Sequence, residues 1–454
     1  MSADSEWEMV IGLEVHTELK TATKLFCGCR NAFGDEPNTN VCPVCTGLPG
    51  SLPVLNQRAV ELAMAIGTAL HCEIRPSTFH RKNYFYPDQA KDYQISQYDE
   101  PINADGWLQL PDGFRVGIER AHMEEDTGKT THAGASGRIH GADYSLVDYN
   151  RSGVPLVEIV SRPDIRTAEQ ARAYAAELRS ILVASGASDG KMEEGSMRVD
   201  ANVSVRRSAA DPFGTRCEIK NLNSLRSLVR AIHHESARQV EVVESGGTIK
   251  METRHWDENS GRTTSGRTKE QSEDYRYFPE PDLVPLAPEA SWVEAVSSSL
   301  PVLPAARRAR LAERTSAPPE DVAVLVDNGL DSLVLAAVDA GADPRTAVNR
   351  ATNELSGAAE GSVLPSPASF ARLVAMESGG ELTATQAKAV LADMLTSGRG
   401  PEEVAKERGF EALGDDALGQ AVAAVIEANP AEWERFKAGD NKVAGFFVGQ
   451  VMKA

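Results

Sequence analysis

The chain has 454 residues, 41% of them hydrophobic and 25% charged, which is ordinary for a globular protein of two to four domains. Its formal net charge of −19 excludes nonspecific attraction as the source of nucleic-acid binding, which would need a local basic patch, a companion protein or metal-bridged phosphates. No apolar run reaches the roughly 18 residues of a membrane span, and MSADSEWEM lacks a signal-peptide profile, so we expect a cytoplasmic protein.

The first strand that we expect is IGLEVHTEL, at residues 11–19, where apolar and polar residues alternate. In an extended chain this alternation places Glu14, His16 and Glu18 on one face and the apolar side chains on the other. A strand face that is only solvated has no need of a carboxylate, an imidazole and a second carboxylate in line. Glu14 and His16 are therefore candidate ligand-binding residues.

Four cysteines follow within nineteen residues, as a C-x-C pair and a C-x-x-C pair: Cys27, Cys29, Cys42 and Cys45. Two close pairs joined by a short loop favour one tetrahedral zinc bound by all four thiolates. Such a site leaves no position for water, so the zinc would be structural. The alternative is four free thiols in a loop. The other two cysteines stand apart and are expected to be buried thiols.

Cations and aromatic residues are interleaved at residues 79–99, where Arg81, Lys82 and Lys91 stand among Phe85 and four tyrosines. Aromatic faces and cations together suit a base and its phosphates, or the terminal nucleotides of an RNA. A tyrosine-rich packed hairpin is the alternative. Residues 274–283, DYRYFPEPDL, are similarly dense.

Acidic clusters occur where a phosphate-binding loop is missing. DTGKTT and SGASDGKM imitate Walker loops but lack the required spacing, and there is no G-x-G-x-x-G at a strand-to-helix turn. Acids gather instead in HMEED (residues 122–126) and KMEEGS (191–196), and Glu158 lies in an apolar strand. Magnesium or manganese that bridges carboxylates to substrate phosphates would account for these acids. The alternatives are a solvated turn for HMEED and a buried salt bridge for Glu158.

The order of elements indicates an α+β fold. A long alternating strand is expected at residues 195–206, and helices at about 167–185 and from a serine N-cap at Ser224 to about 246. Strands and helices do not alternate one for one, so a mixed or antiparallel sheet is favoured over a Rossmann core. Prolines at 279–288 predict a boundary before a helical region, and residues 397–403 predict a second break.

Taken together, these segments resemble the GatB family, whose members are the B subunits of the bacterial aspartyl/glutamyl-tRNA amidotransferase. The resemblance rests on IGLEVH, KNYFYPD, YQISQYDEPI, HMEEDTGK, YNRSGVPLVEIVSRPD, GKMEEGSMRVDANVSVR, EIKNLNS and DYRYFPEPDL. These motifs occur in order and cover most of residues 10–285, while GQVMKA near the C-terminus fits the tail of the family.

The resemblance implies a cradle-shaped α+β catalytic domain related to the glutamine synthetase and guanido kinase fold. We expect it at residues 1–290, with the zinc knuckle at 27–45. A helical domain would follow at 291–398 and a small, tRNA-binding helical tail domain at 399–454.

The implied reaction uses ATP to phosphorylate the side-chain carboxylate of glutamate or aspartate mischarged on tRNA(Gln) or tRNA(Asn), and ammonia then displaces the phosphate. The magnesium site of the family, which is also the catalytic site, falls on Glu14, His16, Glu125 and Glu158. The four cysteines match the zinc knuckle found in part of the family. Phosphoryl transfer of this kind is mainly positioning and charge neutralisation, which metal and carboxylates supply.

Cations are expected at two further places. Lys82, Arg198 and Arg206 are the candidates for contacts to the phosphates of ATP. Near the C-terminus the basic residues outnumber the acids, and the candidates for tRNA binding are Arg435, Lys437, Lys442 and Lys453.

Ammonia would have to come from another protein, because the chain has no amidase signature with a Lys–Ser–Ser arrangement and no credible nucleophilic cysteine. The resemblance implies an amidase (glutaminase) partner, together with a small third partner that clasps both in a heterotrimer.

Two departures from the family are visible. Gly266 stands where a methionine is expected, which would loosen a loop, and family members usually continue some tens of residues beyond GQVMKA, so part of the tRNA-binding surface would be missing. Two other functions remain open: a noncatalytic tRNA-binding scaffold, which would show no ATP hydrolysis dependent on mischarged tRNA, and a stand-alone ligase resembling glutamine synthetase, which would act on the free amino acid.

Overall fold

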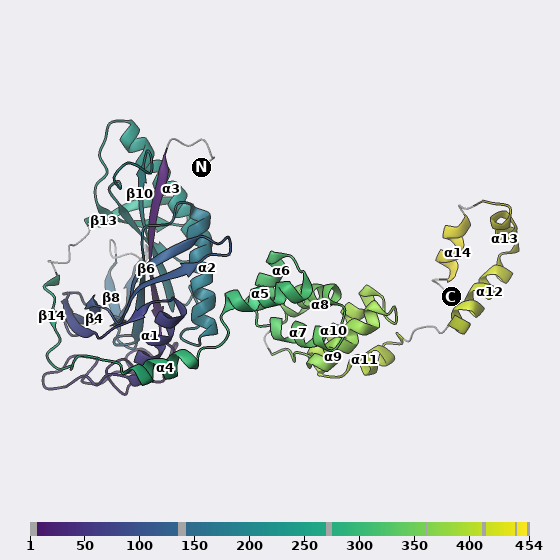
Figure 1. The fold of residues 1–454 in the computed structure, drawn as a ribbon, viewed down its shortest axis with the longest axis horizontal. Coiled ribbons are helices and arrows are strands. Elements are labelled where there is room, and N and C mark those ends of the chain that lie inside the picture. Colours follow the sequence, from purple (N-terminus) through teal and green to yellow (C-terminus); the bar gives the residue numbers. More distant parts are fainter. Residues whose placement is uncertain are drawn as a thin grey trace. The chain divides into compact units, whose positions relative to one another are not determined.

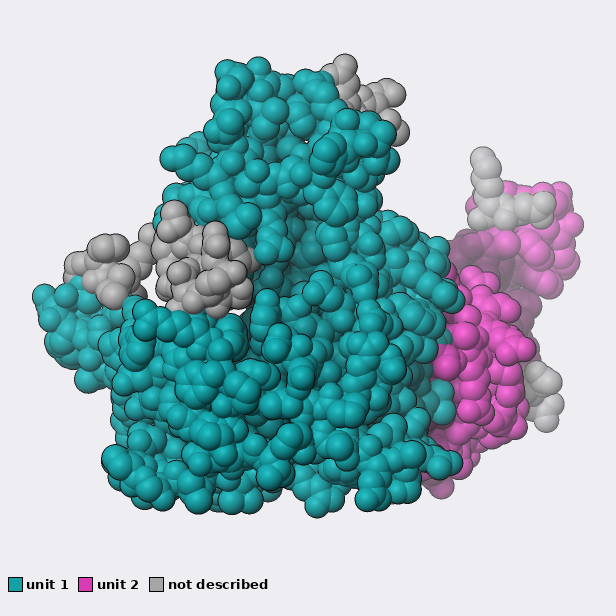
Figure 2. Space-filling view, turned by 60° about the vertical axis from the view of Figure 1, so that its left-hand side comes forward, with its two compact units in different colours: residues 1–305 teal, residues 306–454 magenta. Residues whose placement is uncertain are grey.

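The structure is a computed structural model that describes residues 7–134, 142–268, 275–359, 361–410, 415–440 and 443–451. The chain divides into two compact units, residues 1–305 and 306–454, which are coloured separately in Figure 2. No helix in these described ranges is long and apolar enough to cross a membrane.

The first unit is built on a 12-stranded sheet whose main path runs β13-β12-β11-β10-β1-β9-β6-β4-β3-β14 (Figure 1). Among the described strands, only β11 and β12 pair in parallel, and the other pairs are antiparallel. The strands of this sheet are β1 (Glu8–Glu18), β2 (Glu73–Ile74), β3 (Thr78–Asn83), β4 (Tyr93–Glu100), β5 (Asn103–Gln109), β6 (Arg115–Glu125), β9 (Pro155–Ser161), β10 (Met197–Arg206), β11 (Cys217–Leu222), β12 (Glu252–Asp257), β13 (Arg262–Thr268) and β14 (Phe278–Pro279). A separate hairpin consists of β7 (Lys129–Ala133) and β8 (Tyr144–Asp148). The expected mixed α+β architecture is confirmed.

Three helices cover one face of the sheet: α1 (Gln57–Ala69), α2 (Ala168–Ala184) and α3 (Leu225–Glu244). Figure 1 shows α2 and α3 along this side. Each helix begins at a side-chain N-cap, namely Asn56, Thr167 and Ser224, so the predicted start at Ser224 is confirmed. The apolar residues of β1 pack against these helices and are fully buried, which leaves its polar residues on the opposite, open face.

The first unit extends past the expected boundary at residue 290. Helix α4 (Ala290–Ser298) packs on α1 through Trp292, Val293 and Val296, which join the core of this unit. The proline-rich stretch is therefore a connection within the unit, which ends at Ala305.

The second unit is helical in its described residues: α5 (Pro304–Thr315), α6 (Pro319–Asp327), α7 (Asp331–Asp339), α8 (Pro344–Arg350), the π-helical turn η2 (Ala351–Leu355), α9 (Pro367–Ser378), α10 (Ala384–Ser397), α11 (Pro401–Glu407), α12 (Asp415–Ala428), α13 (Pro430–Lys437) and α14 (Ala444–Val451). Val404 and Ala405 of α11 belong to the same core as α9 and α10. Packing therefore continues across residue 399, where the tail domain was expected to begin.

Candidate active site

The register of three neighbouring strands aligns polar side chains on the open face. On β1 and β9, His16 lies directly opposite Glu158, and Glu158 lies opposite His122 on β6. Because successive residues of a strand point to opposite faces, Glu124 shares the face of His122. Four ionisable side chains from three strands therefore meet at the centre of the sheet.

The distances define a compact cluster. His16 Nε2 lies 3.6 Å from Glu124 Oε1 and 3.9 Å from Glu158 Oε1. His122 Nε2 lies 3.2 Å from Glu158 Oε2, and the His122 side chain is fully buried. Ligand atoms of His16, Glu124 and Glu158 all lie within 4.8 Å of one another. Two carboxylates and an imidazole at this separation fit a divalent cation, which would offset two neighbouring negative charges.

The charges around Glu158 keep it ionised. Burial alone would raise its pKa, but the hydrogen bond from His122 and the charge of His16 outweigh burial and hold the pKa of Glu158 well below its usual range. A glutamate in an apolar strand is thus presented as a carboxylate, which is the form that binds metal.

Glu14 lies on the same face as His16, two residues earlier on β1, and its carboxylate accepts a hydrogen bond of 2.8 Å from Asn202 Nδ2 of β10. Beyond it, Lys220 of β11 lies 2.7 Å from Asp200. Burial would lower the pKa of Lys220, but the carboxylates of Asp200 and Glu218 raise it above its ordinary value. Glu14 therefore borders the cluster on the side of the Lys220 ammonium, which comes from the EIKNLNS segment.

Glu125 points away from this cluster, to the helix-covered face. It forms a buried ion pair with Lys91, and its Oε1 accepts a hydrogen bond of 3.0 Å from the Ile95 backbone N–H. The structure thus brings His16 and Glu158 together with Glu124 and not with Glu125. The sequence HMEED contained a clue to this choice of glutamate. Met123 is apolar and should face the core, so His122 and Glu124, one residue to either side of it, share the opposite face.

The three candidate phosphate-binding cations lie at different distances from the cluster. Arg198 is directly opposite His16 in the ladder between β10 and β1, and it lies 2.9 Å from Asp126. Lys82 of β3 stands 4.7 Å from the ring centroid of Tyr275. Arg206 pairs with Glu8 at the far end of β1, roughly 26 Å along the strand from Arg198. Arg198 is therefore the cation that the structure places at the cluster.

A second acidic pair lies beside Arg198. Burial and the carboxylate of Asp126 raise the pKa of Glu18 to about 7, although Arg198 and Arg151 act in the opposite direction. Arg151 is also 3.4 Å from Asp126. Two carboxylates and two guanidinium groups thus adjoin the cluster at this end of β1.

Aromatic rings also lie next to the cluster, beside His122. Tyr98 stacks on Tyr277 with centroids 5.1 Å apart, and the Arg120 guanidinium carbon lies 4.7 Å from the Tyr98 centroid. The His122 ring meets Tyr98 edge-on at 6.3 Å. The two aromatic segments of the sequence therefore converge on the cluster, since β14 pairs with β3.

The four cysteines form a second candidate metal centre, with sulfur atoms within 4.8 Å of one another. The Cys42 backbone N–H donates to Cys45 Sγ over 3.2 Å, and Lys24 Nζ lies 3.7 Å from the same sulfur. The hydrogen bond from Cys27, together with the Cys42 backbone and Lys24, lowers the pKa of Cys45 to about 4. Four converging sulfurs with a stabilised thiolate fit a tetrahedral zinc.

Two of the four candidate tRNA-binding cations lie in described residues, both on α13. Arg435 is 2.8 Å from Asp440, and Lys437 forms an ion pair with Glu434. Lys442 and Lys453 lie outside the described residues.

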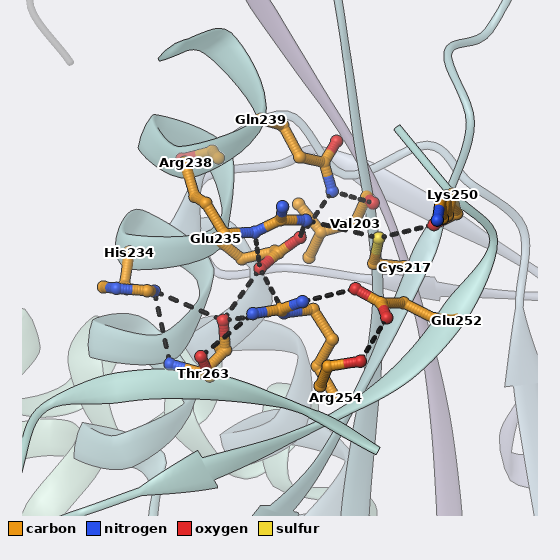
Figure 3. Close-up of polar contacts among 12 residues, drawn as sticks. Val203, Cys217, His234, Glu235, Arg238, Gln239, Lys250, Glu252, Arg254 and Thr263 are labelled. Atoms are coloured by element: carbon orange, nitrogen blue, oxygen red, sulfur yellow. Dashed lines mark hydrogen bonds and ion pairs between the residues drawn. The ribbon is translucent and has the colours of Figure 1, made fainter. Parts of the chain in front are cut away.

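A buried polar network lies on the helix-covered face, and no sequence motif pointed to it. Figure 3 shows Glu235 of α3 between Arg238, Arg254 of β12 and Thr263 of β13. Arg254 Nε lies 3.3 Å from Glu235, whose side chain is fully buried. The network ties α3 to the β12–β13 edge of the sheet and faces away from the candidate active site.

Fold and site together define an α+β protein with an acid–imidazole cluster on the open face of its sheet and a cysteine knuckle beside it. The family described as "GatB/GatE catalytic domain" matches residues 9–294, and the "GatB domain" matches residues 332–454. The chain belongs to the GatB/GatE family.

Curated relatives match nearly the whole chain. A protein of Frankia casuarinae is 52% identical, over 99% of this chain and 92% of its own length. Proteins of Streptomyces coelicolor (49% identical) and Nocardia farcinica (50%) each match 99% of this chain and 93% of their own length. All three are named as the B subunit of aspartyl/glutamyl-tRNA(Asn/Gln) amidotransferase.

Proposed function

We propose that this chain is the amidating subunit of a tRNA-dependent amidotransferase, a ligase of protein biosynthesis. Its substrate is tRNA(Gln) mischarged with glutamate, tRNA(Asn) mischarged with aspartate, or both. ATP phosphorylates the side-chain carboxylate, and ammonia then displaces the phosphate. The first unit is the catalytic cradle, related to the glutamine synthetase and guanido kinase fold, and the chain works in the cytoplasm.

The observation that carries this proposal is the meeting of His16, Glu124 and Glu158 on the open face, with Arg198 in the adjacent ladder position. A divalent cation held there would neutralise charge on the phosphates of ATP. The chain's own contribution is to fix the three ligands on rigid strands and to present a guanidinium beside them. Glu14 of β1 adds a further acid at the border of the same face.

The cysteine knuckle serves a structural role in this proposal. Zinc bound by Cys27, Cys29, Cys42 and Cys45 would fasten the loop between β1 and α1, because four thiolate ligands leave no coordination position for a substrate.

Ammonia comes from a partner in the proposal. An amidase (glutaminase) partner would release it from glutamine, and a small third protein would hold the heterotrimer together. The helical second unit, and α13 in particular, would contact tRNA through Arg435 and Lys437, together with Lys442 and Lys453.

The test is ATP cleavage by the assembled complex with Glu-tRNA(Gln), Asp-tRNA(Asn), the uncharged tRNAs and the free amino acids. Cleavage that requires a mischarged tRNA and yields the amidated product supports the proposal. A noncatalytic scaffold would give no tRNA-dependent cleavage in the presence of ammonium, and a stand-alone ligase would act on free glutamate or aspartate.

A further inference from the structure

Lys24 is a fully buried lysine that lies just before the cysteine knuckle in the sequence. Lysine is almost never fully buried unless its ammonium is paired, because removing a charge from water is costly. The groups that contact the Lys24 ammonium therefore indicate its role.

The Lys24 ammonium has three partners at hydrogen-bonding range. It donates to the Asn40 carbonyl over 2.7 Å and to the Tyr149 carbonyl over 3.2 Å, and it lies 3.7 Å from Cys45 Sγ. These contacts use the three N–H donors of an ammonium, yet none of the three partners is a carboxylate. Of the three partners only the Cys45 sulfur can carry a negative charge, and four thiolates around one Zn²⁺ carry two net negative charges. The loaded knuckle therefore gives the ammonium a stronger anionic partner than the Cys45 thiolate alone.

The same contacts join the knuckle to the turn at residues 149–153. Ser152 Oγ donates to the Cys45 carbonyl over 3.3 Å, and the Leu25 N–H donates to the Gly153 carbonyl over 2.9 Å. Gly153 has φ +84°, and a Cβ added there would lie 3.4 Å from the Cβ of Cys45. The turn is thus packed closely against the knuckle.

From this turn the connection continues to the open face of the sheet. The Gly153 N–H donates to the Asp126 carbonyl over 2.9 Å, and the Asp126 carboxylate lies 2.9 Å from Arg198. Arg198 is the cation beside His16. A short path of contacts therefore leads from Lys24 to the candidate active site.

We propose that Lys24 is a positioning residue that offsets the charge of the metal-loaded knuckle and fastens the knuckle to the 149–153 turn. Loss of the metal or of the ammonium then loosens the turn, Asp126 and the guanidinium that Asp126 holds. The inference rests on the metal that the proposed function places in the knuckle. It adds a link between that structural metal and the catalytic face.

The experiment compares Lys24→Met, Lys24→Arg and the exposed control Lys20→Met in the assembled complex. Zinc transfer to a chromophoric chelator should be about 10–100-fold faster in Lys24→Met, which is the usual effect of losing an outer contact of a metal site. Lys24→Arg keeps the charge and should recover most of the retention, and Lys20→Met should match the wild type. An unchanged rate in a folded Lys24→Met complex overturns the inference.

A second measurement uses the wild type alone, in case Lys24→Met does not fold. Hydrogen exchange is followed in the complex before and after the chelator removes zinc. Amides of residues 126 and 149–153 should lose protection on removal, while those of α2, on the other face of the sheet, should keep theirs. Unchanged protection of the turn overturns the link.

The two proposals fail separately. A wild type purified without zinc under reducing, chelator-free conditions overturns the knuckle assignment, and the inference falls with it. Zinc retained equally by Lys24→Met and the wild type overturns the inference alone.

Discussion

Two adjacent glutamates of β6 face opposite sides of the sheet, so replacing each with glutamine should produce different defects. Glu124 faces His16 and has no lysine or arginine among its ion-pair partners within the described residues. Glu124→Gln keeps the size of the side chain but removes one ligand charge from the cluster. Loss of one preorganised electrostatic contact typically lowers a rate by about 10²–10³, or roughly 3–4 kcal/mol. Stability should change little.

Glu125→Gln should instead destabilise the fold. Glu125 is 2% exposed and Lys91 is 6% exposed, so the change leaves a buried ammonium without its counter-charge. Breaking a buried pair on one side costs about 3–5 kcal/mol. The glutamine can still accept from the Ile95 N–H, which favours the lower end of that range.

One set of assays separates the two variants. Urea unfolding of the purified chain measures stability, and ammonium-supported transamidation by the complex measures the chemistry over a range of magnesium concentrations. Glutamine hydrolysis serves as the control, because its nucleophile would lie on another protein of the complex. We assign Glu124 to the cluster and Glu125 to the core because they face opposite sides of the strand. This assignment would be refuted if Glu125→Gln had normal stability but failed in transamidation while Glu124→Gln remained active.

Three further results are expected. Cys42→Ser should lose about one zinc per chain and loosen the knuckle, as measured by metal analysis and limited proteolysis, and zinc retention would contradict this. Charge reversal of Lys437 and Lys442 should weaken tRNA binding and lower its salt slope by about two, unless the tRNA contacts lie elsewhere. The pKa of Glu18 is about 7 in the folded chain, against an ordinary value of 4.5, so stability should fall as pH rises through this window. Glu18→Gln should remove that fall, at most about 3 kcal/mol, in urea titrations at pH 5 and pH 8.

The sequence predicted β1, its two faces and the Ser224 cap well, because alternation and capping are local patterns. It did not separate Glu124 from Glu125, since three consecutive acids conceal the phase of a strand. The apolar Met123 was the only local guide to that phase. Lys91, which pairs with Glu125, lies 34 residues away in sequence, and no periodicity predicts a contact across two strands.

The compact unit reaches Ala305, past the predicted boundary at residue 290, for a related reason. Prolines at 279–288 interrupt regular structure, and an interruption of this kind resembles the end of a domain. The apolar side chains of α4 show where the core ends, because Val296 is buried and Trp292 is partly buried in a core that includes α1, a helix more than 200 residues earlier. A short stretch of sequence can show where secondary structure breaks. It cannot show where a hydrophobic core ends, because that depends on contacts with distant residues.

The electrostatics of the tail bear on how this acidic chain would bind RNA under the proposed function. Arg435 and Lys437 are half exposed or more, and each already has a carboxylate partner on or next to α13. Exposed pairs of this kind contribute only about 0–1 kcal/mol, so a phosphate can replace Asp440 or Glu434 at little cost. Replacement leaves those carboxylates close to the RNA, and a net charge of −19 adds repulsion at long range. Contacts made by the tail alone should therefore be weak, and tRNA binding should draw much of its strength from partner proteins.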